Sequence, residues 1–101
     1  MKRSAIILND KDNIATALTK LAAGEVIQLE MIGRTLSVTL LDAIPFGHKF
    51  SLTRIKPNSP VTKYGEKIGE ATANIQPGQH VHVHNVGGTR GRGDLITREV
   101  K

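Results

Sequence analysis

The spacing of apolar residues divides the chain into short extended segments joined by turns. Residues 4–8 form a brief apolar run that is typical of a strand. Segments 26–32 and 35–40 alternate apolar and polar side chains around a Gly-centred turn at Gly33, and this pattern predicts a β-hairpin. We therefore expect a mostly β protein.

One segment near the N-terminus has a different period. Four apolar residues recur there at helical spacing: Ile14, Ala15, Leu18 and Leu21. Asp10 or Asp12 can cap a helix at its start, and Gly24 is a natural stop at its end. The pattern predicts one short N-terminal α-helix that covers a sheet.

Proline and glycine interrupt the later strands. Pro45 and Gly47 break regular pairing, so we expect His48 and Lys49 to lie outside a strand ladder. Segments 55–61 and 75–81 both read Ile, one residue, Pro, three residues, Val. This repeat predicts an apolar anchor that enters a turn and a strand that leaves it, in a compact and irregular β structure.

Three of the four histidines occupy every second position of segment 80–85, which reads His-Val-His-Val-His-Asn. In a strand the imidazoles would share one face and the two valines the other. Residues i and i+2 lie about 6.5 Å apart, so neighbours in the row can share a metal ion but all three cannot. We expect two of these histidines plus an outside ligand such as His48. The alternative is a solvated polar face, or histidines that bond to backbone carbonyls.

Composition limits the class of protein. The chain has 101 residues, is 39% hydrophobic, and contains no Trp, no Cys, one Tyr and two Phe. It is expected to be one domain with an aliphatic core and no disulfide, zinc ribbon or cysteine nucleophile. No long apolar run follows Met1, so we expect no signal peptide, no membrane span and a cytoplasmic location.

The charge distribution bears on the ligand. The net charge is +5, but the basic residues are scattered and few aromatics are present to stack on bases. We expect an acidic small molecule or acidic partner rather than nucleic acid. Residues 87–101 are Gly/Arg-rich and are expected to be a flexible tail after a domain at 1–86.

Several motifs follow one another in a fixed order along the chain. They are Gly-His-Lys-Phe at 47–50, Val-Thr-Lys-Tyr-Gly-Glu at 61–66, Ile-Gly at 68–69 and the histidine row at 80–85. This ordered set resembles the SAF domain of altronate and galactarate dehydratases. The same module occurs as a separate small subunit in relatives such as sulfolactate sulfo-lyase. The resemblance covers residues 5–85.

The resemblance implies a β-clip fold and a lyase that removes water, or in one branch sulfite, from a sugar-acid-like substrate. It implies help from a divalent metal such as iron(II) or manganese. Most of the family's catalytic machinery sits in a larger domain that this chain lacks. The chain is therefore interpreted as the small subunit of a two-component dehydratase, with a separate large catalytic subunit as partner and a homo-oligomer left open.

The resemblance also implies roles for individual residues. Acid–base catalysis is expected from His48 and His80, and metal binding from His82 and His84. Substrate contacts are expected from Lys49, Lys63, Tyr64 and Asn85. In the structural alternative, Lys63 is solvated, Tyr64 fills the core and Gly65 serves a turn. Two other functions stay open, namely a stand-alone module for sugar acids and a small metal-binding protein.

Overall fold

The computed structural model describes residues 4–31 and 33–88, which form nine β-strands and no helix. In chain order the strands are β1 (Ala5–Ile6), β2 (Ile14–Ala17), β3 (Val26–Met31), β4 (Arg34–Thr39), β5 (Lys49–Ser51), β6 (Pro60–Lys63), β7 (Glu66–Ala71), β8 (His80–Val81) and β9 (Val86–Gly87). No described segment is a helix long and apolar enough to cross a bilayer. The expectation of a mostly β protein is confirmed. Most of the predicted tail, from residue 89 onward, lies outside the described residues.

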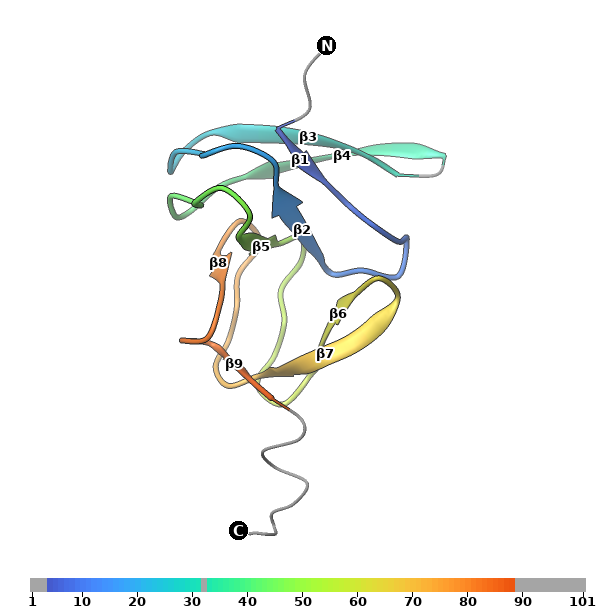
Figure 1. Ribbon diagram of the computed structural model, residues 1–101, viewed down its shortest axis with the longest axis vertical. Coiled ribbons are helices and arrows are strands. Elements are labelled where there is room, and N and C mark those ends of the chain that lie inside the picture. The colour runs from blue at the N-terminus through green and yellow to red at the C-terminus, as the bar shows by residue number, and fades with distance from the viewer. Residues whose placement is uncertain (1–3, 32, 89–101) are drawn as a thin grey trace, which may run out of the picture.

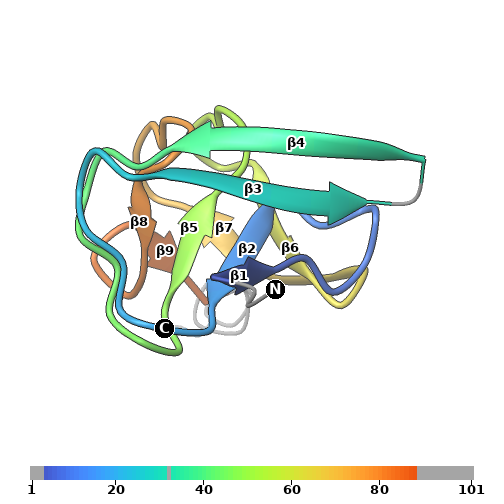
Figure 2. The ribbon, with the colours of Figure 1, turned by 90° about the horizontal axis from the view of Figure 1, so that it is seen from above.

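The strands form three antiparallel sheets. The central sheet has the order β1-β2-β5-β8, β3 pairs with β4, and β6-β7-β9 form the third sheet. The β3–β4 hairpin lies above the central sheet and β6, β7 and β9 lie below it (Figure 1). Seen from above, the hairpin extends past the central strands (Figure 2). Its register pairs Val26 with Thr39 and Met31 with Arg34, so the predicted hairpin is confirmed.

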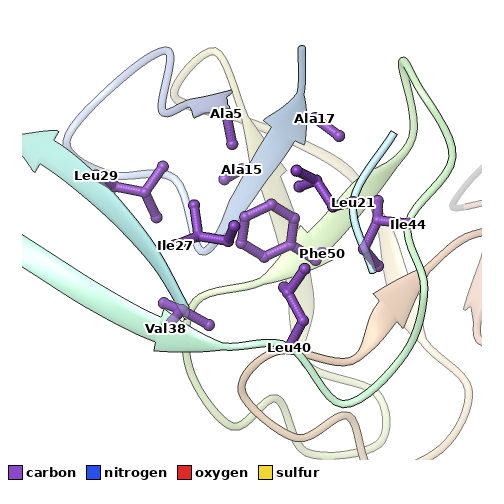
Figure 3. Packing of buried hydrophobic residues seen from close by; sticks show 10 residues of the cluster. All are labelled: Ala5, Ala15, Ala17, Leu21, Ile27, Leu29, Val38, Leu40, Ile44 and Phe50. Atoms are coloured by element: carbon purple, nitrogen blue, oxygen red, sulfur yellow. The ribbon is translucent and has the colours of Figure 1, made fainter. Parts of the chain in front are cut away.

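Two apolar clusters form the core, and β2 contributes to both. The first cluster contains Ala5, Ala15, Ala17, Leu21, Ile27, Leu29, Val38, Leu40, Ile44 and Phe50. Figure 3 shows the Phe50 ring at the centre of this cluster. The second cluster contains Ile14, Ile55, Val61, Ala71, Ile75 and Val81. Because successive strand residues point to opposite faces, β2 is buried on both sides.

The predicted N-terminal helix is wrong. Residues Ile14–Ala17 form β2, which pairs with β1 on one side and β5 on the other. A strand covered on both faces has no alternation of apolar and polar residues, so its run of apolar side chains resembles the stripe of a helix. Burial on both faces and pairing on both edges therefore decide the conformation of this segment.

The turn predicted after Ile55 and Ile75 also follows Leu21 and Ile44, where the sequence repeat is absent. The apolar anchors form two antiparallel bridges, Leu21 with Ile44 and Ile55 with Ile75. Three positions after each anchor the backbone φ is positive, and the next amide donates to the carbonyl of the residue that follows the anchor. The positive-φ residues are Gly24, Gly47, Asn58 and Gly78. Equivalent turns thus precede β3, β5, β6 and β8. Candidate site residues lie in or beside β5 and β8.

Candidate functional site

The histidine row begins in a strand and ends in a turn. Only His80 and Val81 belong to β8, and the chain turns over residues 82–85. Val81 is buried, whereas Val83 is 82% exposed, so the expected alternation of faces fails after Val81. The backbone reverses here because Asn85, 3% exposed, bonds to it in both directions. The Asn85 Nδ2 donates to the His80 carbonyl (2.8 Å), and the His82 amide donates to Asn85 Oδ1 (3.0 Å).

This turn brings three imidazoles together, His48, His80 and His82, which we call the imidazole cluster. One nitrogen from each ring lies within 4.8 Å of the others. His48 Nδ1 and His80 Nε2 are 2.9 Å apart and share a hydrogen bond. His82 stacks on His48 with ring centroids 4.4 Å apart. His84 is exposed, and its ring is tilted by 35° to that of His80 at 5.3 Å, outside the cluster.

Adjacent strands position the two hydrogen-bonded rings. In the β5–β8 ladder His80 is opposite Phe50, a fully buried residue. His48 precedes β5, and its carbonyl accepts a hydrogen bond from the Ala17 amide (2.8 Å). The His80 amide donates to Asp42 Oδ2 (2.9 Å), a contact across 38 residues. Asp42 is a site residue that sequence reasoning missed, because nothing near it in the chain indicates this partner.

The local environment keeps two of these imidazoles neutral. The pKa of His80 is lowered, first by burial and then by His48, His84 and His82, while Asp42 opposes the shift. The pKa of His82 is lowered by desolvation and then by the charges of His48, Lys49 and His84. A neutral imidazole offers a free lone pair, as a general base or a metal ligand requires. His80 and His82 are thus favoured in the protonation state that acid–base or metal chemistry needs.

Lys49 connects the imidazole cluster to a second group of residues. Contrary to the expectation that it leaves the ladder, Lys49 lies in β5, paired with Thr16 and Val81. Its pKa is lowered by burial and by the charge of Lys63. Because Lys49 in turn lowers the pKa of His82, the positive charge of Lys49 lies close both to the neutral His82 ring and to Lys63.

Lys63 and Tyr64 lie at the tip of the β6–β7 hairpin. The Lys63 Nζ sits 5.1 Å from the centroid of the Tyr64 ring. Tyr64 is 63% exposed, so it is not a core filler. Tyr64 and Gly65 have φ values of 58° and 75°, which are the signs of a type I′ turn. The turn role of Gly65 is therefore confirmed.

A buried carboxylate holds this hairpin tip. Asp12 is 6% exposed, and its two oxygens accept hydrogen bonds from the amides of Tyr64 (3.1 Å) and Gly65 (2.8 Å). Asp12 was a candidate helix cap, and that interpretation is wrong. It caps a turn 52 and 53 residues away instead. Local sequence offers no signal for such a partner.

Neither Lys49 nor Lys63 forms an ion pair among the described residues. Across residues 4–31 and 33–88 the ion pair within 4.0 Å is Lys67–Glu70. Glu66 is opposite Lys63 in the β6–β7 ladder, and the Asp12 carboxylate bonds to the Tyr64 amide, but neither carboxylate is paired with a lysine ammonium. An ammonium of this kind binds a carboxylate or sulfonate as a point charge. The arrangement can bind an anion and exchange a proton beside it.

The donor set limits which metal the cluster fits. Three imidazoles and no carboxylate suit iron(II), zinc or nickel, whereas manganese prefers oxygen ligands. A nitrogen lone pair lies in the plane of its ring, and the rings of His48 and His82 are stacked at 16°. One of these rings must therefore rotate before both bind one ion. Of the expected metal ligands, His82 belongs to the cluster and His84 does not.

Comparison with known proteins identifies related sequences. Residues 3–89 match the family model described as the altronate/galactarate dehydratase SAF domain. The chain is 40% identical to an altronate dehydratase of Bacillus subtilis over 82% of its length, and 45% identical to that of Escherichia coli over 73%. It is also 45% identical, over 52% of its length, to the (2R)-sulfolactate sulfo-lyase subunit alpha of Chromohalobacter salexigens. The chain spans only 16% and 14% of the two altronate dehydratases, and 56% of the sulfo-lyase subunit.

Proposed function

The chain belongs to the altronate/galactarate dehydratase SAF domain family, and on that premise we propose that it is the small subunit of a two-component sugar-acid dehydratase. It supplies part of the active site to a separate large catalytic chain. The similarity to a protein named a sulfo-lyase subunit alpha supports this division. The turns, paired through two antiparallel bridges, support the β-clip that the family implies. We expect the complex to work in the cytoplasm.

The observation that carries the proposal is the position of Lys49, which follows His48 in the chain and pairs with Val81, between His80 and His82. Lys49 and Lys63 bind the substrate carboxylate, and the imidazole cluster begins beside Lys49. Dehydration next to a carboxylate removes the α-proton and expels the β-hydroxyl as water, which leaves an enol. The proton on the α-carbon is acidic enough to remove only while its carboxylate is neutralised, so the lysines and the base must be neighbours.

We assign the acid–base step to the pair His48 and His80. Their nitrogens face each other at 2.9 Å and so hold a proton between them. One ring accepts the α-proton while the other shares the resulting charge, and the same proton can pass to the departing hydroxyl. Positioned acid–base groups of this kind contribute about 10²–10⁴ in rate.

The remaining roles follow from this assignment. We propose His82 and His84 as metal ligands, together with ligands from the large chain. In this structure His82 lies with His48 and His80, so His84 must move towards His82 for both to bind one ion. Iron(II) bound there would supply a Lewis acid for the leaving hydroxyl. Asn85 holds the turn that carries both residues, and a substrate contact through it stays a prediction.

Reconstitution with the large chain tests the proposal. The complex is expected to dehydrate an aldonate or aldarate, and His48→Gln or His80→Gln to lower kcat by about 10²-fold or more. Lys49→Gln and Lys63→Gln should raise KM about tenfold, because each removes a charged partner of the carboxylate. Lys56→Gln, an exposed lysine on a different turn, is the matched control and should change neither constant. A large chain that is fully active alone, or that never binds this chain, contradicts the proposal.

A sulfo-lyase is the second candidate. The similarity to a sulfo-lyase subunit alpha, itself a small chain, favours it. The same lysines and imidazoles would serve, but the bond that breaks joins carbon to sulfur and the product is sulfite. Release of sulfite from sulfolactate, with no turnover of sugar acids, would select this candidate.

A further inference from the structure

The turn that carries His48 is one of the four equivalent turns that precede β3, β5, β6 and β8. In each turn the amide of the fourth residue donates to the carbonyl of the first, as the His48 amide does to Pro45 (3.0 Å). The third residue has a positive φ, which is typical of a type II turn. The turns cover residues 22–25, 45–48, 56–59 and 76–79. They can therefore be compared position by position.

In two of these turns the side chain of the fourth residue also accepts a hydrogen bond from the amide of the first. The Ala22 amide donates to Glu25 Oε1 (2.8 Å), and the Gln76 amide donates to Gln79 Oε1 (2.9 Å). This contact holds the fourth side chain against its own turn.

His48, the fourth residue of its turn, has an acceptor of suitable reach. Its Nδ1 is bonded to Cγ, as Oδ1 of Asn85 is, and that oxygen accepts from the His82 amide within a turn (3.0 Å). A neutral imidazole with its proton on Nε2 accepts a hydrogen bond at Nδ1. An amide on the first residue of the turn would therefore compete with any other partner of His48 Nδ1.

The first residue of this turn is Pro45, which has no amide hydrogen. It offers His48 no donor, whereas Ala22 and Gln76 donate to the fourth side chain in their turns. His48 Nδ1 instead lies 2.9 Å from His80 Nε2 and shares a hydrogen bond with it. The missing amide thus coincides with the turn whose fourth side chain pairs with a distant residue.

Turn chemistry does not explain the proline. Pro57 and Pro77 occupy the second position of their turns, where the fixed φ of proline suits a type II turn. Pro45 occupies the first position, and Phe46 occupies the second. Pro45 is also exposed, so burial of its ring gives no reason for it either.

We propose that Pro45 is a positioning residue for the acid–base pair, because its lack of an amide hydrogen leaves His48 Nδ1 to share a proton with His80. This inference rests on the proposed function, which assigns the acid–base step to these two rings. An amide at position 45 gives His48 Nδ1 a second donor and turns the ring towards its own turn. The backbone of the turn stays in place, since the His48 amide still donates to the carbonyl of residue 45.

A spectroscopic signature tests this role in the chain alone. At about pH 8, where imidazoles are neutral, wild-type protein should show ¹⁵N–¹⁵N coupling across the His48–His80 hydrogen bond. Pro45→Ala should lower this coupling by about half or more, because two hydrogen bonds of comparable strength then compete for Nδ1. A coupling between the amide nitrogen of residue 45 and His48 Nδ1 should appear in its place.

Two further proteins separate the missing amide from the stiffness of the proline ring. Pro57→Ala, at an exposed position of an equivalent turn, is the matched control. Both alanine variants should lower Tm by about 3 °C, but Pro57→Ala should leave the His48–His80 coupling unchanged. A synthetic chain with N-methylalanine in place of Pro45 has no ring and no amide hydrogen, and it should keep the coupling.

Kinetics of the complex test the consequence for catalysis. Pro45→Ala should lower kcat in proportion to the lost coupling, about twofold or more, with KM for the aldonate unchanged because the lysines stay in place. N-methylalanine at position 45 should restore kcat, and Pro57→Ala should not change it.

The outcomes distinguish this inference from the proposed function. Wild-type protein without the coupling, a coupling that Pro45→Ala leaves unchanged, or a loss that N-methylalanine shares would each overturn the inference, and these measurements need no partner chain. If the wild-type complex is active and the coupling falls without a fall in kcat, the positioning role is wrong and the proposed function stands. If the wild-type complex dehydrates no acid, the proposed function fails, and the catalytic part of the inference fails with it.

Discussion

Two turns carry part of the candidate site, and each is held by a buried polar side chain. The turn at residues 82–85 carries His82 and His84, and the turn at residues 64–65 follows Lys63 and carries Tyr64. Asn85 holds the first turn as part of it, through bonds to residues three and five positions away. Asp12 holds the second turn from 52 and 53 residues away, with a carboxylate in place of an amide.

The difference lies in how much each turn depends on the rest of the fold. The Asn85 side chain is neutral and forms its hydrogen bonds with the backbone of its own segment, as Asn side chains commonly do in turns. Asp12 is a buried carboxylate whose hydrogen bonds exist only once the β1–β2 connection and the hairpin have met. The histidine turn is thus largely a local structure, whereas the tyrosine turn is created by tertiary contact.

Removing the Asp12 carboxylate should cause the largest loss in the free energy of unfolding. Asp12→Ala leaves the amides of Tyr64 and Gly65 without an acceptor, so the free energy of unfolding should fall by about 3 kcal/mol. Urea denaturation at pH 7 measures the loss. Asp10→Ala, an exposed carboxylate in the same loop, is the matched control and should change stability by less than about 0.5 kcal/mol. Equal losses in the two variants would contradict the role assigned to Asp12.

Removing the Asn85 side-chain amide should lower the free energy of unfolding less than removing the Asp12 carboxylate does. It should disturb the imidazole rings of His80 and His82 more. Asn85→Ala loses one donated and one accepted hydrogen bond, at a cost of about 2 kcal/mol. It should shift the imidazole ¹⁵N resonances of His80 and His82, whereas Asp12→Ala should leave them in place. Asn74→Ala, at an exposed position, is the control. The comparison between the two turns fails if Asp12→Ala moves these resonances as much as Asn85→Ala does.

Lowering the pH should cause the smallest of the three losses in the free energy of unfolding. The pKa values of His80 and His82 are lowered in the fold, so below pH about 6.5 the unfolded chain binds more protons than the folded chain. The stability that these neutral rings contribute is present above that pH and is lost as the pH falls through their folded pKa values. Unfolding measured between pH 8 and pH 5 should show this decline, and His80→Gln should reduce it. Stability that rises towards acid pH would be the opposite result.

Much of the architecture was predictable because it depends on local spacing. The β3–β4 hairpin followed from alternation around Gly33, and the turns after Ile55 and Ile75 followed from an apolar anchor and a nearby proline. The prediction of two histidines from the row plus His48 agrees with the group that the structure brings together. The ordered motifs also indicated the family to which the chain belongs.

The remaining features were decided by contacts between distant segments. Ile14–Ala17 became a strand because β1 and β5 pair with it and both core clusters cover it. Lys49 entered the ladder through its pairing with Thr16 and Val81.

The sequence alone determined a mostly β chain of this family with histidines at its candidate site. Spacing along the chain fixes which side chains share a face, and that information is local. Only the tertiary structure decided that Asp12 and Asp42 act on residues 52 and 38 positions away. A carboxylate has the same local context whether it caps a helix or a remote turn, and it is the packing of the chain that selects its partner.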